Sequence, residues 1–177
     1  MSMQLVPPSP SRHGPCAAEP RIGWREFDHA VPGASDALRA LGLAVDATGL
    51  EKRLTELLKV RVSQMNGCAF CLQLHLGWAR KAGVPDPQLD LLPVWREAGC
   101  FDARECAALE WAEALTRMER APVDGDLHAR AAAAFAPPEL AALTAAVAAI
   151  NAWNRIAGAL RFALPGSEGA ARTPLTD

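Results

Sequence analysis

Apolar residues recur every three to four positions along most of this chain of 177 residues, and no segment alternates apolar and polar residues as a half-buried strand does. The spacing predicts helices at about 33–45, 50–65, 68–82, 102–120, 126–135 and 139–164, with a short helix or turn at 86–93 and a connector at 94–101. No internal repeat of about 20–50 residues is visible. The pattern therefore predicts an all-α fold.

Local signals support several of these helix ends. Asn66-Gly67 separates two helical patterns with residues that tolerate a positive φ and end a helix. Asp102 and Glu105 have the spacing of a capping box, in which each side chain bonds the other residue's backbone N–H. Pro138 suits the first turn of the last helix, where a missing N–H has no cost.

Two of the predicted helices show a clear apolar face. On the helix at about 33–45 the residues that share one side are Ala37, Leu38, Leu41 and Val45. On the next helix they are Leu50, Leu54, Leu57, Leu58 and Met65, with Glu56 at the margin of the face. Arg61 falls inside this second face. A permanent cation there predicts either a buried partner or a subunit interface.

Length and composition suit one helical domain. A chain of 177 residues can bury a substantial core, and its hydrophobic content of 50% with abundant alanine is typical of soluble helical proteins. Residues 1–20 are rich in proline and predict a disordered N-terminal tail. Residues 165–177 are polar and predict a C-terminal tail. The domain is predicted at 21–164.

Charge and hydropathy exclude several classes of function. The formal net charge is −2 and no cluster of Lys and Arg forms a strip, so neither nucleic acid nor an anionic membrane is an expected partner. The first residues lack the apolar region of a secretory signal. The longest apolar run, Leu140–Ile150, is too short to span a bilayer and predicts a core helix. These features predict a cytoplasmic protein.

The cysteines direct attention to one helix. Five cysteines is an odd number, and a close Cys-x-x-Cys pair in a reducing compartment is more often redox-active or metal-binding than a structural disulfide. Cys68, Cys71 and His75 fall within an arc of roughly 80° on the helix at 68–82. The two thiols lie one turn apart, and His75 lies one turn beyond Cys71. The imidazole is therefore expected to reach the Cys71 sulfur directly or through one water.

Glu56 is predicted to face His75 from the preceding helix. If that helix ends near Met65, Glu56 lies about 13 Å back from the turn and His75 about 10 Å beyond it, at 1.5 Å per residue. A tight turn at Asn66-Gly67 favours antiparallel packing, which brings the two groups to a similar depth. Taken alone, Glu56 is also typical of a solvated helix carboxylate with Lys52 and Lys59 as partners.

These residue types suit thiol chemistry. A thiolate attacks a peroxide or a disulfide, a nearby imidazole or helix N-terminus lowers a thiol pKa, and a carboxylate orients the imidazole. Once one cysteine is oxidised to a sulfenic acid, a second thiol one turn away can condense with it to a disulfide. The residues leave open which thiol attacks: the helix N-terminus and greater exposure favour Cys68, whereas proximity to His75 and Glu56 favours Cys71.

The motif resembles a known family. Glu56, eleven intervening residues, Cys68-x-x-Cys71 and His75, preceded by Ser63-Gln64-x-Asn66-Gly67, look like the AhpD-like alkylhydroperoxidase group of the carboxymuconolactone decarboxylase superfamily. The likeness extends more loosely over about 24–162, including Trp95-Arg96-Glu97 and the stretch 150–155. The decarboxylases of the superfamily generally lack the cysteine pair, which disfavours lactone decarboxylation here.

The resemblance implies a fold and a set of roles. It implies an AhpD-like helical bundle that forms a homo-oligomer, with the site near a subunit boundary. Cys71 would attack the peroxide, Cys68 would resolve the intermediate, and Glu56 with His75 would relay protons. Some members place a further histidine at the position of Phe70, and this departure predicts weaker peroxidase activity.

The sequence thus predicts a thiol-dependent peroxidase or disulfide reductase that needs no metal or organic cofactor. Its expected substrate is a hydroperoxide, and its expected partner is a thiol or dithiol protein reductant. The alternative is a redox-sensing or binding oligomer without significant turnover. A zinc site built from Cys68, Cys71, His75 and Glu56 is a competing interpretation.

Outside the motif, Cys100 and Cys106 are expected to be structural, and Cys16 lies unpaired in the predicted tail. Asn151, Asn154 and Arg155 are expected to fix the last helix through polar contacts, with a role in the site as the weaker alternative.

Overall fold

The computed structural model describes residues 20–166, and all regular secondary structure within them is helical, as the hydrophobic pattern predicts. The elements are α1 (Trp24–Ala30), α2 (Ala34–Asp46), α3 (Lys52–Met65), α4 (Ala69–Lys81), α5 (Asp86–Leu91), the 3₁₀ helix η1 (Leu92–Val94), α6 (Trp95–Ala98), α7 (Ala103–Thr116), α8 (Gly125–Ala134) and α9 (Pro137–Leu160). The predicted tails, with Cys16, lie outside the described residues except for Pro20, Pro165 and Gly166.

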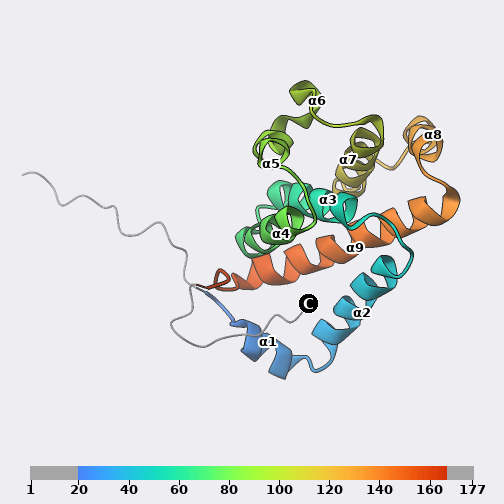
Figure 1. The fold of residues 1–177 in the computed structure, drawn as a ribbon. Coiled ribbons are helices and arrows are strands. Elements are labelled where there is room, and N and C mark those ends of the chain that lie inside the picture. The colour runs from blue at the N-terminus through green and yellow to red at the C-terminus, as the bar shows by residue number, and fades with distance from the viewer. Residues whose placement is uncertain (1–19, 167–177) are drawn as a thin grey trace, which may run out of the picture.

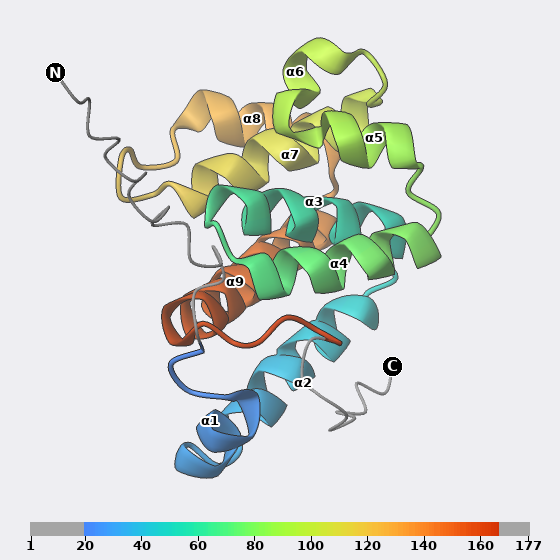
Figure 2. The ribbon, with the colours of Figure 1, turned by 90° about the vertical axis from the view of Figure 1, so that its left-hand side faces the viewer.

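Helix α9 is the central element of the bundle, because it packs against α2, α3, α4, α7 and α8. Figures 1 and 2 show it crossing beneath the antiparallel pair α3 and α4, with α1 and α2 on its other side. A main hydrophobic core joins these helices around residues such as Leu58, Leu143 and Ile150. A smaller core lies under α5 to α7 and contains Leu57, Leu92 and Trp95. The hairpin of α3 and α4 is therefore packed on both sides, which fixes the groups it carries.

By length and composition alone, α9 could cross a membrane. The helix is longer than the apolar run Leu140–Ile150, which was judged too short to span a bilayer and was predicted to form a core helix. Half of its most apolar window is buried inside the structure. Core helices pass the same length and composition test, and five neighbouring helices pack against this one. Its surroundings are those of a core helix.

Two predicted helix ends are wrong by four residues. Helix α7 ends at Thr116 and not near Arg120, because residues 117–120 are exposed and gain little from burial, while Pro122 follows closely. Helix α9 ends at Leu160 and not at Leu164. There Arg161 takes a left-handed conformation with φ 53°, and the N–H of Phe162 bonds back to the carbonyl of Ala157 at 3.0 Å.

An aromatic cluster explains the turn after α9. Phe162 is buried, and its ring lies 5.5 Å from Trp24 and 5.6 Å from Phe70, in edge-to-face arrangements. Trp24 also stacks on Trp153 of α9 at 5.5 Å. Burial of these rings offsets the strain of a non-glycine residue with positive φ. The cluster also fastens α1 to the bundle.

The predicted apolar side of α2 is only partly correct. Val45 is buried, but Ala37 and Leu41 are exposed, and the small polar residue Ser35 is buried instead. The main neighbour of helix α2 is α9, so only a narrow strip of the surface of α2 is covered. The capping box of Asp102 and Glu105 is confirmed.

Arg61 has the buried partner that its position on the apolar face predicts. Its guanidinium lies 2.6 Å from the carboxylate of Glu113 on α7. The same carboxylate accepts a hydrogen bond of 3.0 Å from the indole of Trp95 and pairs with Arg96 at 2.7 Å. Burial raises the pKa of Glu113, but its three hydrogen-bond donors outweigh this and lower it below 4.5.

Replacing Glu113 with glutamine is expected to lower the free energy of unfolding by about 3 kcal/mol, because Arg61, whose side chain is only 13% exposed, would lose its counter-ion. Glu110→Gln on the same helix is the control, since its pair with Arg130 is exposed and should contribute less than about 1 kcal/mol. The contribution of Glu113 to the free energy of unfolding is fully present above the unfolded-state pKa of 4.5. It is lost as the pH falls below that value and through the lower pKa of the folded state. Denaturant titrations of both variants at neutral and acid pH measure their free energies of unfolding. Equal losses of stability in Glu113→Gln and Glu110→Gln would contradict the prediction.

Candidate active site

The turn between α3 and α4 positions the cysteine pair. Asn66 ends α3 with an ordinary helical φ of −84°, so only Gly67, with φ 64°, takes the positive value predicted for this dipeptide. The N–H of Cys68 then bonds to the carbonyl of Ser63 at 3.1 Å. Cys68 is the N-cap of α4, and its sulfur accepts the backbone N–H of Cys71 at 3.4 Å. The two thiols therefore lie together at the start of the helix.

Both thiols are buried, with exposed fractions of 1% for Cys68 and 2% for Cys71. The expectation that Cys68 is the more exposed of the two is therefore wrong. The reason is that α9 lies across the start of α4: a Cβ atom added at Gly158 would come within 3.9 Å of the Cys68 Cβ. The dithiol lies just beneath the surface.

The two thiols differ in acidity. The hydrogen bond from the Cys71 thiol lowers the pKa of Cys68 from 9.0 to about 7, and backbone N–H groups of Cys71 and Phe70 add to this against the effect of burial. The same hydrogen bond, followed by burial and the charge on Cys68, raises the pKa of Cys71. In the reduced pair the negative charge therefore rests on Cys68, at the helix N-terminus.

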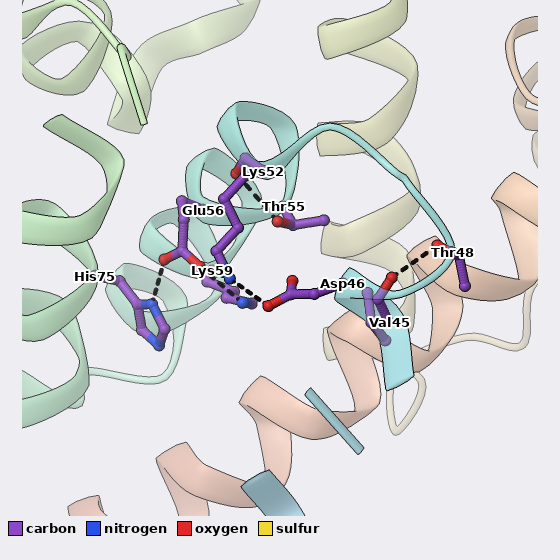
Figure 3. Close-up of polar contacts among 8 residues, drawn as sticks. All are labelled: Val45, Asp46, Thr48, Lys52, Thr55, Glu56, Lys59 and His75. Atoms are coloured by element: carbon purple, nitrogen blue, oxygen red, sulfur yellow. Dashed lines mark hydrogen bonds and ion pairs between the residues drawn. The ribbon is translucent and has the colours of Figure 1, made fainter. Parts of the chain in front are cut away.

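The predicted meeting of Glu56 and His75 across the hairpin is present. Nδ1 of His75 lies 2.6 Å from Oε2 of Glu56, and both side chains are buried (Figure 3). The other carboxylate oxygen lies 2.8 Å from Nζ of Lys59 and 3.6 Å from Nζ of Lys52. The alternative of a solvated carboxylate is excluded, because Glu56 is 0% exposed even though both lysines are its partners.

This arrangement sets the protonation of the pair. Burial raises the pKa of Glu56, but the hydrogen bonds and charges of His75 and Lys59 outweigh it and lower the pKa to about 2. For His75, burial is the largest influence and lowers its pKa below 6.5, and the nearby lysines oppose the effect of Glu56. An ionised carboxylate can only accept, so Nδ1 of the neutral ring carries the hydrogen. Nε2 is left with a free lone pair.

No hydrogen bond between residues 20 and 166 joins His75 to either thiol. His75 instead follows Cys71 by one turn of α4, a spacing that puts the two Cβ atoms about 5–6 Å apart. Its ring packs edge-to-face on Trp78 at 5.0 Å. The structure thus brings Glu56 to His75 and Cys68 to Cys71, and leaves a gap of one helical turn between the two pairs.

Asn154 of α9 also contacts the dithiol, in a role that sequence reasoning gave only as its weaker alternative. Its buried amide donates to Ser63 at 3.2 Å, and its hydrogen bond to Cys71 lowers the pKa of that thiol. Asn66 donates in turn to Asn154 at 2.9 Å and to Asn151 at 3.0 Å, which fixes α9 as predicted. The sequence feature that could have indicated this role is the pair Asn151 and Asn154, three residues apart within an alanine-rich core helix.

The remaining candidates lie outside the site. Phe70 joins the aromatic cluster through Phe162. Both Cys100 and Cys106 were expected to be structural. The side chain of Cys100 is exposed and therefore does not contribute to the core. Cys106 is half-buried, and its thiol donates to the carbonyl of Phe101 at 3.8 Å. In the described part of the chain, no three His, Cys, Asp or Glu side chains are grouped so that they could hold a metal ion.

A shallow depression of about 440 Å³ lies beside the dithiol, between the α3–α4 turn and the last turns of α9. Its lining residues are Asn66, Gly67, Asn154, Arg155, Gly158 and Ala159. Two of them, Asn154 and Gly158, contact the cysteines on their inner side. The depression is therefore separated from the two thiols by one layer of residues.

Sequence comparisons find relatives of this chain. A sequence model described as the Carboxymuconolactone decarboxylase family matches residues 32–114, which include all four predicted site residues. The uncharacterized protein YdfG of Bacillus subtilis (strain 168) is 35% identical over 113 residues, covering 64% of this chain and 77% of YdfG. The uncharacterized protein YnjA of Escherichia coli (strain K12) is 31% identical over 118 residues, covering 66% of this chain and 64% of YnjA.

Solved structures share the fold. A protein of unknown function from Agrobacterium tumefaciens, described as a candidate antioxidant defence protein AhpD, superimposes with a TM-score of 0.78 at 36% identity and covers 83% of this chain and 99% of its own. An uncharacterized peroxidase-related protein from Silicibacter sp. TM1040 superimposes with a TM-score of 0.66 at 21% identity, covering 74% and 70%. The second likeness supports the fold alone. Together with the first it confirms the predicted AhpD-like helical bundle.

Proposed function

Because the chain belongs to the AhpD-like proteins of the carboxymuconolactone decarboxylase family, we propose that it is a thiol-dependent oxidoreductase with antioxidant activity. Its substrates are hydroperoxides, or disulfides in a related exchange, and its electrons come from a thiol or dithiol protein. The observation that carries the proposal is the buried dithiol of Cys68 and Cys71 one turn from a Glu56–His75 pair. No metal or organic cofactor enters the reaction.

The proposed reaction uses the two thiols in sequence. A thiolate sulfur bonds to the terminal oxygen of the hydroperoxide, the O–O bond breaks, and the leaving oxygen takes up a proton to give the alcohol. The second thiol then attacks the sulfenic acid, the S–S bond forms and the oxygen leaves as water. Two thiols thus supply the two electrons that reduce the peroxide. Exchange with the external reductant restores both.

His75 and Glu56 manage the protons of this cycle. The free lone pair on Nε2 can accept the Cys71 proton directly or through a water, and the carboxylate then stabilises the imidazolium. His75 and Lys59 lower the pKa of Glu56 and keep it ionised, so that it can act only as an acceptor. This proton transfer is needed because the Cys71 thiol is the less acidic of the two.

The order of attack follows from where the proton goes. We assign the attack to Cys71, as the family resemblance implies, because His75 lies one turn away and can take its proton. The resting charge on Cys68 favours the opposite order, in which Cys68 attacks and His75 activates Cys71 as the resolving thiol. The two orders differ in which serine variant accumulates a sulfenic acid.

A redox sensor without turnover is the second candidate. The burial of both thiols favours it, because a buried pair reacts with small oxidants more readily than with a protein reductant. Such a protein would form the Cys68–Cys71 disulfide but would not recycle it.

Hydroperoxide consumption in the presence of several thiol and dithiol reductants tests the choice between these functions. We expect continuous consumption with at least one dithiol reductant, at a rate that saturates with that reductant. A single turnover, with the disulfide retained under every reductant, would instead identify a sensor.

The proposal also covers the oligomeric state and the cellular compartment in which the cysteine pair is oxidised and reduced again. We propose a homo-oligomer in the reducing environment of the cytoplasm, without a membrane or a nucleic acid as partner. Exposed leucines on α2, Leu41 and Leu43, support the assembly, because they offer apolar surface that a neighbouring subunit can cover.

A further inference from the structure

The depression beside the dithiol carries a positive charge. Arg155 lies in its wall, and its Nη1 donates to the backbone carbonyl of Asn151 at 2.9 Å and to that residue's side-chain oxygen at 2.8 Å. No carboxylate pairs with Arg155 in the part of the chain that the structure describes. Asp and Glu are also absent from the six residues that line the depression.

A second arginine lies at the same rim. Nη1 of Arg21 donates to the carbonyl of Ala159, one of the lining residues, at 3.2 Å, and Arg21 likewise has no carboxylate partner between residues 20 and 166. Elsewhere in the bundle, Arg53, Arg61 and Arg104 each pair with a glutamate. The depression therefore combines two uncompensated cations on a chain whose net charge is −2.

The depression is also close to the reacting sulfurs. Gly158 packs on Cys68, and the amide of Asn154 bonds to Cys71, so one layer of side chains separates a bound molecule from the thiols. The lining is made of amides, a guanidinium and small residues, with no large apolar side chain. This composition suits a short polar molecule better than a long alkyl chain.

We propose that the depression binds the carboxylate of the substrate, and that the preferred hydroperoxides are short molecules carrying a carboxylate. Arg155 has N–H groups left over to form a charge-assisted pair with it, which is the geometry that guanidinium groups offer to carboxylates. The hydroperoxide at the other end of the molecule is then directed at the thiols. This inference rests on the proposed function for the reaction, but the anion site itself is independent of turnover.

Alkylation tests the anion site without requiring peroxidase activity. Iodoacetate and iodoacetamide react in the same way, by forming a bond from the thiolate sulfur to carbon as iodide leaves, and differ in the carboxylate. The rates of alkylation at Cys68 and Cys71 are measured by peptide mass spectrometry. The ratio of the iodoacetate rate to the iodoacetamide rate is then divided by the same ratio for 2-mercaptoethanol. We expect the reduced full-length protein to favour iodoacetate by about tenfold, from one charge-assisted hydrogen bond. Added salt should lower this preference.

Arg155→Met should bring the normalised ratio close to one. The ratio cancels any general effect of the substitution on thiol reactivity. Lys81→Met is the matched control, because it removes one exposed positive charge at the far end of α4 and should leave the preference unchanged. A wild-type ratio at or below one, or a ratio that Arg155→Met does not lower, overturns the inference.

A pair of hydroperoxides then tests the substrate class. A tert-butyl-type hydroperoxide carrying a carboxylate should oxidise the wild-type dithiol faster than its methyl ester, and Arg155→Met should remove this difference. Equal rates for acid and ester in the wild type would overturn the substrate assignment. If the acid and the ester are both turned over at equal rates, the carboxylate preference is contradicted, while the proposed function is not. An iodoacetate preference without any peroxide reaction upholds the anion site and contradicts the proposed function.

Discussion

Replacement of Cys71 by serine is expected to abolish hydroperoxide turnover, reducing it to the rate of the uncatalysed reaction. The reason is that a single remaining thiol cannot form the disulfide through which the reductant regenerates the enzyme. Steady-state consumption of an organic hydroperoxide with an excess of dithiol reductant measures the effect. Undiminished turnover in Cys71→Ser would remove the basis of the proposed function.

Matched variants separate this effect from a general loss of thiols. Cys100→Ser should retain full turnover, because Cys100 is exposed and lies between α6 and α7, outside the hairpin that carries the dithiol. Cys68→Ser should lose turnover as completely as Cys71→Ser. A sulfenic-acid trap then gives the order of attack: the adduct should form at Cys71 in Cys68→Ser, and an adduct at Cys68 in Cys71→Ser would reverse the assigned roles.

Replacement of Glu56 by glutamine is expected to lower kcat by about a hundredfold, the lower range for loss of acid–base assistance. The ionised carboxylate holds Nδ1–H of His75 and leaves Nε2 free to accept a proton, whereas a glutamine amide can turn its NH₂ toward the ring and favour the other tautomer. Since the pKa of Glu56 is about 2, the carboxylate is ionised at neutral and alkaline pH alike. The loss should therefore persist at both.

Glu97→Gln is the control for Glu56→Gln, because Glu97 is an exposed carboxylate on α6. The Glu56 substitution also leaves Lys59 without its carboxylate, so circular dichroism must show that the variant is folded. We expect a fall in kcat with KM for the hydroperoxide nearly unchanged. An increase in KM alone would mean that Glu56 acts on binding and not on proton transfer.

The hairpin was the part of the site that the sequence predicted best. Helical periodicity and the Asn66-Gly67 turn were enough to place Glu56 and His75 at the same depth, and the two groups do form a hydrogen bond. Depth along a helix depends only on residue count, and a short turn leaves little freedom in the pairing. Arg61 was predictable for a similar reason, because a cation on an apolar face requires a partner.

The environment of the site could not be predicted, because it depends on elements distant in sequence. Cys68 was expected to be exposed at its helix start, but α9 covers it through Gly158, some ninety residues later. The contact of Asn154 with Cys71 arises from the same packing. The end of α9 at Leu160 follows from the burial of Phe162 among the rings of α1 and α4, which local sequence signals do not contain.

The central claim is that Cys68 and Cys71 are oxidised together by the substrate. The most direct measurement adds one equivalent of organic hydroperoxide to the reduced protein and quantifies the alcohol formed and the disulfide-linked peptide by mass spectrometry. The account predicts one Cys68–Cys71 disulfide for each molecule of alcohol. Alcohol formed while this pair remains reduced, or no alcohol formed at all, would contradict it.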